Sequence, residues 1–235
     1  MKILALDSSG LVASVALLED DTMVAEYTTN FKLTHSQTLL PMLDELKQRV
    51  QLELESIDAI AVAMGPGSFT GLRIGAATAK GLGLALKKPL IPIPSVDGLA
   101  YNLFGAKGII CPIMDARRNQ VYTGFYCFKD GEFIVKKEQC AVAMQDILDE
   151  LKNQDEKVTF LGDGVKVHKQ LIQEVLGDQA IFAPAHVNKQ RGAAIGALGE
   201  LYMLQGKAVT ADEFEPEYLR KSQAEREREE RLKHE

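Results

Sequence analysis

The fold is decided by one glycine-rich stretch, which reads Gly65-Pro66-Gly67-Ser68-Phe69-Thr70-Gly71-Leu72-Arg73-Ile74-Gly75. An apolar run at residues 57–62 precedes it, and a segment of helical composition follows it to about Leu86. This order predicts a strand, a tight turn, and a helix capped by Ser68 or Thr70. Small residues then recur at every fourth position of the helix, and they are Gly71, Gly75, Ala79 and Gly83. Because such a ridge lacks side chains, we expect another element to pack closely against it.

A glycine-rich turn at a helix N-terminus can also bind a phosphate group. The Walker pattern requires a lysine directly after its last glycine, whereas Leu72 and Arg73 follow Gly71 here. The dinucleotide-binding spacing of glycines is missing as well. The residues of the loop therefore favour a close-packed turn, and a phosphate site is the alternative.

The other segments predict the order strand, strand, strand, helix, strand, helix, twice along the chain. In the first half we expect strands at 2–6, 11–18 and 23–29, a helix at 35–50, the central strand and helix, a strand at 90–94, and a helix at 96–104 capped by Ser95. In the second half we expect strands at 109–114, 120–128 and 132–141, a helix at 144–151, a strand at 158–161 and a helix at 164–176. A last helix is expected at 189–205. This repeat of elements, without repeated sequence, predicts an α/β protein of two βββαβα lobes.

The bulk composition is that of an ordinary globular protein, with 46% apolar and 26% charged residues in 235 positions. A net charge of −6 argues against the chain gripping a nucleic-acid backbone by itself. Its three cysteines form no C-x-x-C pair, so we expect free thiols. No apolar run approaches the roughly 18 residues that span a bilayer, and Asp7 interrupts the first one, so we expect a cytoplasmic protein without a signal peptide.

Two strand ends carry an exposed-looking acid. Asp7-Ser8-Ser9 follows the first strand, and Asp115-Ala116-Arg117-Arg118 follows the first strand of the second half. Each stretch is either a phosphate-facing loop or an ordinary turn, and local chemistry favours the turn. The four histidines show no His-x3-His or Glu-x-x-His spacing, so the sequence predicts no local metal site.

The glycine-rich stretch, the opening residues 3–9, His35-Ser36-Gln37 and Pro216-Glu217-Tyr218-Leu219-Arg220 together resemble the bacterial TsaB family, also called YeaZ. The resemblance implies the duplicated actin-like or RNase-H-like fold of sugar kinases and Hsp70 ATPase domains. It further implies a non-catalytic, activating partner of TsaD, and with it of TsaE, in forming threonylcarbamoyladenosine at position 37 of ANN-decoding tRNAs. Asp7, Ser8 and Ser9 would then be a vestigial phosphate loop. The alternatives are an ATPase or small-molecule kinase of this fold and, less favoured, a metallopeptidase.

The resemblance also implies how the chain meets its partners. We expect no catalytic residue and no cofactor or metal in the isolated chain, with ATP, ADP and metal entering through TsaD and TsaE and tRNA bound only through the complex. A homodimer is expected in isolation, on the same surface that binds TsaD. The expected interface residues are His35, Leu39, Leu40, Leu43, Leu46, Leu72, Gly75, Ala76 and Ala79. Among them, Leu40, Leu72 and Ala76 occupy positions that one helix face cannot all bury.

Four segments are expected along the chain. Residues 1–104 would form the first lobe and 105–188 the second, with the boundary at the glycine-rich 105–108. Residues 189–219 would pack back onto the first lobe. Residues 220–235 mix charges densely and are expected to form a solvated helix or a disordered tail.

Overall fold

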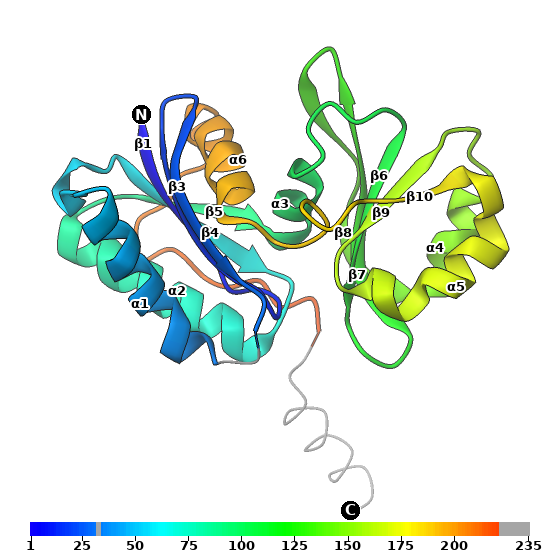
Figure 1. Cartoon of the computed structure of the whole chain (residues 1–235), viewed down its shortest axis with the longest axis horizontal. Helices are drawn as coiled ribbons and strands as arrows, with labels where there is room; N and C mark the ends of the chain where they lie inside the picture. The colour runs from blue at the N-terminus through cyan, green and yellow to red at the C-terminus, as the bar shows by residue number, and fades with distance from the viewer. Residues whose placement is uncertain (32–33, 221–235) are drawn as a thin grey trace, which may run out of the picture.

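The computed structural model of the protein describes residues 1–31 and 34–220, which form two α/β lobes side by side (Figure 1). The first sheet has the order β3-β2-β1-β4-β5 and consists of β1 (Lys2–Asp7), β2 (Ala13–Glu19), β3 (Thr22–Thr29), β4 (Ala59–Gly65) and β5 (Leu90–Pro94). The second has the order β10-β9-β6-β7-β8 and consists of β6 (Ile109–Asp115), β7 (Gln120–Lys129), β8 (Glu132–Ala143), β9 (Val158–Leu161) and β10 (Ala180–Phe182). The helices are α1 (His35–Arg49), α2 (Phe69–Leu86), α3 (Ser95–Tyr101), α4 (Met144–Leu151), α5 (Gly164–Leu176) and α6 (Gly192–Leu204), with 3-10 turns η1 (Leu54–Ser56) and η2 (Gly177–Gln179).

The central strand of the first sheet, β1, is apolar along nearly its whole length because both of its faces are covered. Leu4 and Leu6 face the core under α1 and α2, whereas Ile3 and Ala5 face the core under α6. This alternation is the two-residue period of a strand. The strand pairs antiparallel with β2 and parallel with β4, and β6 of the second lobe repeats both pairings with β7 and β9. The α/β class and the duplicated βββαβα order of the predicted actin-like fold are therefore confirmed.

Each lobe is packed by a helix that follows the sheet of the other lobe along the chain. Helix α3 follows the first sheet along the chain, but its Val96, Leu99 and Ala100 pack with residues of β6, β7 and β9 in the second. Helix α6 follows the second lobe, yet it packs on β1, β2 and β5 of the first through Ile195 and Leu198. Figure 1 shows α3 and α6 between the two sheets, with α1 and α2 at one end of the molecule and α4 and α5 at the other. The three boundaries between the four predicted segments stay a prediction.

A buried carboxylate lies where the exchanged helices meet. Asp97 of α3 is 2% exposed and accepts hydrogen bonds from the hydroxyl groups of Tyr126 on β7 (2.7 Å) and Tyr202 on α6 (2.9 Å). Burial raises the pKa of Asp97 above its usual range, and the two tyrosine hydrogen bonds oppose the shift. One side chain thus joins the second sheet to the helix that covers the first.

The structure corrects three local predictions. Pro94, not Ser95, is the N-cap of α3, because the Ser95 hydroxyl accepts a hydrogen bond from the N–H of Gly65 instead. Helix α3 ends at Tyr101, and α6 begins only at Gly192. Strand β10 was not predicted, since three residues are too short to show a period. No helix in the described ranges is long and apolar enough to cross a bilayer.

Candidate functional site

The motif loop, defined as residues 65–73, joins β4 to α2 through a cis Gly65–Pro66 peptide bond. Ser68 is the N-cap of α2, as the sequence predicts, and its hydroxyl accepts from the N–H of Gly71 at 3.3 Å. Thr70 lies within the first turn of the helix and is exposed.

The glycine ridge packs on the turn at residues 8–9. The N–H of Ser68 donates to the carbonyl oxygen of Ser9 at 2.7 Å, and the hydroxyl of Ser8 donates to the carbonyl oxygen of Gly71 at 2.9 Å. A Cβ on Gly67 would lie 2.1 Å from the Ser9 carbonyl oxygen, and one on Gly71 would lie 2.1 Å from that of Ser8. The predicted close approach of another element is therefore confirmed, and that element belongs to the same chain.

This packing closes the Asp7-Ser8-Ser9 turn. Asp7 is 1% exposed, and its Oδ1 accepts from both the backbone N–H (2.8 Å) and the hydroxyl (2.7 Å) of Ser9. Burial raises the pKa of Asp7 to about 6, while the Ser9 hydrogen bonds and the nearby His35 act in the opposite direction. The carboxylate therefore faces the protein interior, where neither a solvent-borne phosphate nor a hydrated cation meets it.

His35 begins α1 and completes this cluster. Its Nε2 lies 2.8 Å from the carbonyl oxygen of Gly10, and its Nδ1 is buried without a hydrogen-bond partner in the described part of the chain. A Cβ on Gly71 would lie 3.0 Å from the ring. The ring thus fills the space between the first hairpin and the motif loop.

The last described residues, 215–220, run beside the motif loop, and we call them the C-terminal strap. The N–H of Glu217 donates to the carbonyl oxygen of Met64 at 2.7 Å. The ring of Tyr218 lies 4.6 Å from that of Phe69, which also carries the Arg73 guanidinium 4.1 Å from its centroid. A Cβ on Gly65, whose φ is 119°, would lie 2.2 Å from the Glu217 carbonyl oxygen. Gly65 is therefore required by the strap as well as by the turn.

The second lobe reaches the same place through one side chain. Gln139 of β8 donates from its Nε2 to the carbonyl oxygen of Gly65 at 3.2 Å and to the carboxylate of Glu217. Arg220 donates to the carbonyl oxygen of Ala116 in the β6–β7 turn. The strap thereby contacts both lobes. Residues 221–235, for which we predicted a charged tail, lie outside the described residues.

Most of the predicted interface residues are used inside the first lobe. Leu40 is 54% exposed and His35 is half-buried. Buried side chains or glycines occupy the remaining positions, which are Leu39, Leu43, Leu46, Leu72, Gly75, Ala76 and Ala79. Of the three positions that one helix face cannot all bury, Leu40 is the exposed one, whereas Leu72 and Ala76 turn inward and are buried like the leucine stripe of α1. Whether the helix pair contacts a partner stays a prediction. Such a contact would use the outward face of the pair.

The outward face of this pair has a mild apolar character. On α2, Ala77, Gly81, Leu84 and Ala85 are exposed, and Leu84 is 57% exposed. Together with Leu40 they leave two large apolar side chains in water on adjacent helices. We call this set the helix-pair surface.

A cleft of about 450 Å³ lies between the lobes on another part of the molecule. Its floor contains the predicted Asp115 turn, whose Oδ1 accepts from the N–H of Arg117 at 2.8 Å. The N–H of Asp115 donates to the side chain of Asp163, at the start of α5, at 3.0 Å. The Arg117 side chain is 84% exposed and lies 3.6 Å from the Asp115 carboxylate, and Arg118 is also exposed. This is the solvated turn that the sequence favours.

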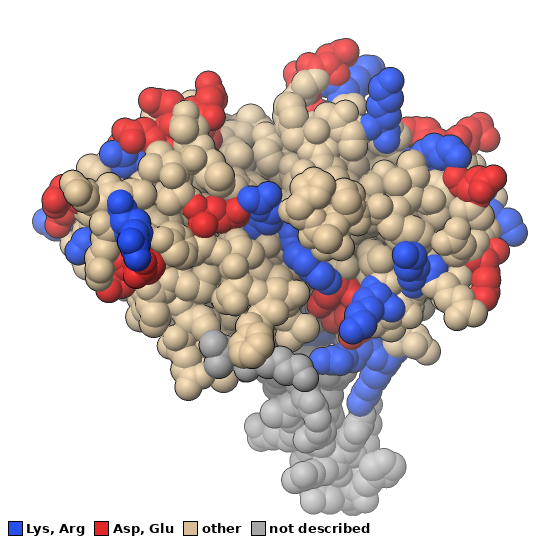
Figure 2. Space-filling model, in the orientation of Figure 1, with Lys and Arg blue, Asp and Glu red and all other residues tan. Residues whose placement is uncertain are grey.

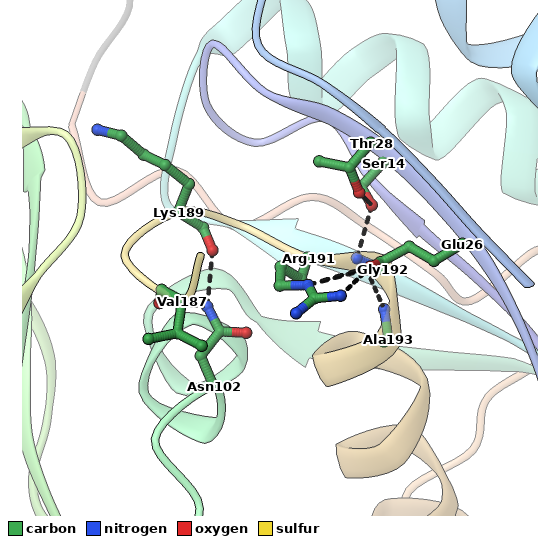
Figure 3. Close-up of polar contacts among 9 residues, drawn as sticks. All are labelled: Ser14, Glu26, Thr28, Asn102, Val187, Lys189, Arg191, Gly192 and Ala193. Carbon is green, nitrogen blue, oxygen red and sulfur yellow. Dashed lines mark hydrogen bonds and ion pairs between the residues drawn. The ribbon is translucent and has the colours of Figure 1, made fainter. Parts of the chain in front are cut away.

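The crossing segment 187–193 forms one wall of the cleft and is held at both ends (Figure 3). Asn102 donates from its Nδ2 to the carbonyl oxygens of Val187 (3.2 Å) and Lys189 (2.6 Å). At the other end, the guanidinium of Arg191 pairs with the carboxylate of Glu26, whose side chain is 8% exposed. The N–H groups at the start of α6 donate to Ser14 (2.7 Å) and Glu26 (3.0 Å). The backbone that carries Lys189 and Gln190 is therefore fixed.

Sequence reasoning missed the residues that join the lobes, namely Asp97, Gln139, Lys189, Gln190 and Arg191. Each contacts a residue far away along the chain, which no local period reports. A buried polar residue in an apolar run, such as Asp97 beside Val96 and Leu99, was the one available signal. Within the described residues no three His, Cys, Asp or Glu side chains converge as metal ligands. The predicted lack of metal and cofactor stays a prediction.

Comparison with known proteins gives consistent matches. A family model described as "TsaD: tRNA N6-adenosine threonylcarbamoyltransferase" matches residues 23–228. The chain is 38% identical over 227 residues to the tRNA threonylcarbamoyladenosine biosynthesis protein TsaB of Bacillus subtilis, covering 96% of each. It is 32% identical over 231 residues to the protein of the same name from Escherichia coli, covering 95% of this chain and 96% of that one. The solved structure of YeaZ from Pseudomonas aeruginosa matches with a TM-score of 0.77 and 26% identity, covering 93% of this chain and 99% of that one.

Proposed function

The chain belongs to the TsaB family, and we propose that it is a non-catalytic, activating subunit of the complex that forms threonylcarbamoyladenosine at position 37 of ANN-decoding tRNAs. Relatives named as tRNA threonylcarbamoyladenosine biosynthesis proteins match along nearly the whole chain and support the pathway. In this proposal the partners are TsaD and TsaE, and tRNA, ATP or ADP, and metal are bound through them. The location is the cytoplasm, where tRNA is modified.

One observation carries the non-catalytic part of the proposal, namely the closed Asp7 turn. An acid that handles a phosphate or its metal must present its oxygens to the ligand. Asp7 instead points its Oδ1 at Ser9 under the motif loop and is 1% exposed. The chemistry would then belong to the partner.

The helix-pair surface is the proposed contact with TsaD and, in the absence of TsaD, with a second copy. Interfaces are enriched in apolar residues at their centre, and Leu40 and Leu84 are the large apolar side chains that this pair leaves exposed. Because one patch would serve both assemblies, homodimer and heterodimer would exclude each other.

The test replaces Leu40 by glutamate. Leu40→Glu is expected to weaken TsaD binding and homodimer formation together, by about tenfold or more, since a buried interfacial charge is costly. Leu204→Glu is the matched control, because Leu204 is 75% exposed at the far end of α6 and undergoes the same chemical change. Binding is measured by calorimetry and self-association by sedimentation, with thermal unfolding to confirm that both variants fold.

The interface proposal fails if Leu40→Glu binds TsaD as tightly as the unchanged chain does. Two other predicted interface residues, Leu39 and Gly75, are unsuitable for this test because they pack inside the lobe. Leu39 is 1% exposed, and a Cβ on Gly75 would lie 2.5 Å from the Ser8 hydroxyl. Changes at those two positions would unfold the lobe rather than test a surface.

The second candidate function is an ATPase or kinase, which the lysines lining the interlobe cleft favour. The proposed non-catalytic role instead predicts no ATP hydrolysis above background and no bound transition metal in the purified chain. Steady ATP turnover that is abolished by Asp7→Ala, or stoichiometric zinc or iron by elemental analysis, would replace the proposal by this candidate or by a metallopeptidase.

A further inference from the structure

The interlobe cleft carries chemistry that the proposed function does not use. It is lined from both lobes, by the first hairpin on one side and by α5 and the crossing segment on the other. Figure 2 shows Lys and Arg side chains gathered between the two lobes on this face. Its volume of about 450 Å³ lies in the range of small-ligand sites.

Two ammonium groups in the cleft have no carboxylate partner. Lys166 of α5 and Lys189 of the crossing segment both line it, and within the described residues neither lies at ion-pair distance from an acid. Figure 3 shows the Lys189 side chain extending away from the contacts that hold its backbone. Half-burial lowers the pKa of Lys189, the nearby Asp163 opposes this shift, and Lys166 adds to it. A negatively charged ligand would stabilise both ammonium groups.

An amide group supplies a further donor. Gln190 lines the cleft and is 2% exposed, and in the described part of the chain its buried Nε2 has no hydrogen-bond partner. An unpaired buried donor costs about 1–3 kcal/mol. The contacts of Asn102 and of Glu26 fix the backbone on either side of Lys189 and Gln190, so both residues are positioned before any ligand arrives.

The acids of the cleft are largely occupied by their own neighbours. Asp115 accepts from the N–H of Arg117, and Asp163 accepts from the N–H of Asp115. The cleft is lined by three cationic side chains (Arg117, Lys166 and Lys189) and two carboxylates (Asp115 and Asp163), so its net charge is +1. That balance suits a ligand with a single negative charge.

The mouth of the cleft is apolar. Leu11 of the first hairpin is 70% exposed, Phe31 after β3 is 70% exposed, and Val167 of α5 is 59% exposed. All three line the cleft, and they come from both lobes. Large apolar side chains left in water beside a concave site gain free energy when an apolar group covers them.

We propose that this cleft binds a ligand that has one carboxylate and an apolar body. The carboxylate lies against Lys166, Lys189 and the Gln190 amide, and the apolar body lies against Leu11, Phe31 and Val167. A polyphosphate fits less well, because it would bring several negative charges onto Asp115 and Asp163. The described residues also offer no cluster of metal ligands to offset that charge. This ligand chemistry is shared by small carboxylic acids and by the C-terminal residue of a protein chain.

The test titrates the isotopically labelled protein with hexanoate and with hexanamide, its neutral counterpart, and follows the backbone amide signals of Lys189 and Gln190. Hexanoate is expected to bind saturably and about tenfold more tightly than hexanamide, which lacks the charge. The double variant Lys166→Gln/Lys189→Gln is expected to lose this preference. Lys169→Gln is the matched control, since Lys169 is an exposed lysine of the same helix outside the cleft, and it should keep the preference.

Two further ligands separate the sources and the rival ligand class. A tripeptide Ala-Ala-Leu with a free C-terminus that binds more tightly than hexanoate, and than its own C-terminal amide, would assign the site to a protein terminus, whereas weaker binding would assign it to a small acid. Either result supports the proposal. Equal binding of hexanoate and hexanamide, an unchanged preference in the double variant, or tighter binding of ADP with or without Mg²⁺ would overturn it. None of these outcomes depends on TsaD, so the inference and the proposed function fail separately.

Discussion

The two lobes place an aspartate at the same point of the repeat and give it opposite surroundings. Asp7 ends β1 and Asp115 ends β6, and each accepts a hydrogen bond at 2.8 Å from the N–H two residues later. The two turns therefore share an Asx-type hydrogen bond, although only in the second does the donor residue, Arg117, have a positive φ, of 65°. Yet Asp7 is 1% exposed, whereas the side chain of Asp115 is 21% exposed and faces the cleft.

The difference comes from where the following glycine loop packs. In the first lobe, Gly67 and Gly71 approach the carbonyl oxygens of Ser9 and Ser8, which follow the aspartate. In the second lobe, Gly162 and Gly164 approach the carbonyl oxygen of Ile113, which precedes it. In the first lobe the glycines contact the residues after the aspartate and cover its turn. In the second lobe they contact the residue before the aspartate and leave its turn open. A repeated fold thus fixes the position of a loop, and the contacts of the neighbouring glycine loop decide whether it is open to a ligand.

The largest effect is expected from a substitution that disrupts the closed Asp7 turn. Gly71→Ala should destabilise the protein by about 3 kcal/mol or more, because the new Cβ would lie 2.1 Å from the Ser8 carbonyl oxygen and the backbone must move. Gly81→Ala is the matched control on the same helix, where a Cβ meets nothing within 4 Å. It should be neutral or stabilise by up to about 1 kcal/mol. Urea unfolding measures both, and equal stabilities would refute the packing described for α2.

The next effect concerns the charge buried in that turn. The pKa of Asp7 is about 6 when folded and 3.8 in the ordinary state, so the folded protein binds the extra proton between those values. Stability from this group therefore falls as the pH rises from about 4 to about 6, by about 3 kcal/mol at most.

Asp7→Asn removes the titration while keeping an oxygen for Ser9. The difference in unfolding free energy between this variant and the unchanged chain should grow in favour of Asn across that pH range, and it should level off above it. The difference cancels the titration of every other acid. A flat difference would mean that Asp7 is solvated, and the contrast with Asp115 would disappear.

Much of this contrast was beyond prediction from the sequence. Local periods located the second lobe well, since the predicted starts at 109, 120, 132, 144, 158 and 164 are those of the structure. The glycine ridge predicted a close approach, but not that Ser8 and Ser9 make it. The leucine stripe of α1 was read as a partner surface, because apolar spacing shows which face is buried and not against what.

Contacts between the lobes escaped prediction for a different reason. The exchange of α3 and α6 depends on residues about a hundred positions apart, such as Asp97 and Tyr202. Helix α6 starts late because Arg191, with φ of −141°, stays extended to reach Glu26. A helical composition at 189–191 gives no sign of that ion pair. Tertiary contacts of this kind override local propensity.

A smaller effect tests the bridge between the second lobe and the motif loop. Gln139→Ala removes two hydrogen bonds, to the carbonyl oxygen of Gly65 and to Glu217, and should cost about 1–2 kcal/mol because the acceptors are partly buried. Gln145→Ala is the matched control, since Gln145 bonds an exposed Asp149 one helical turn away. It should cost less than about 0.5 kcal/mol. Similar losses in both variants would mean that the strap and β8 do not hold the loop together.

The smallest effect is expected at the open turn. Arg117→Ala should change the unfolding free energy by less than about 0.5 kcal/mol, because an exposed ion pair contributes little and alanine meets the same positive φ. Arg191→Ala makes the same substitution at a half-buried pair with Glu26 and should cost about 3 kcal/mol, since it strands a buried carboxylate. In a reconstituted modification reaction, Arg117→Ala should leave the yield of threonylcarbamoyladenosine unchanged. If modification is lost while the variant folds normally, the open turn contacts a partner or a nucleotide. The two aspartate turns would then differ in function as well as in packing, with the second lobe carrying the functional one.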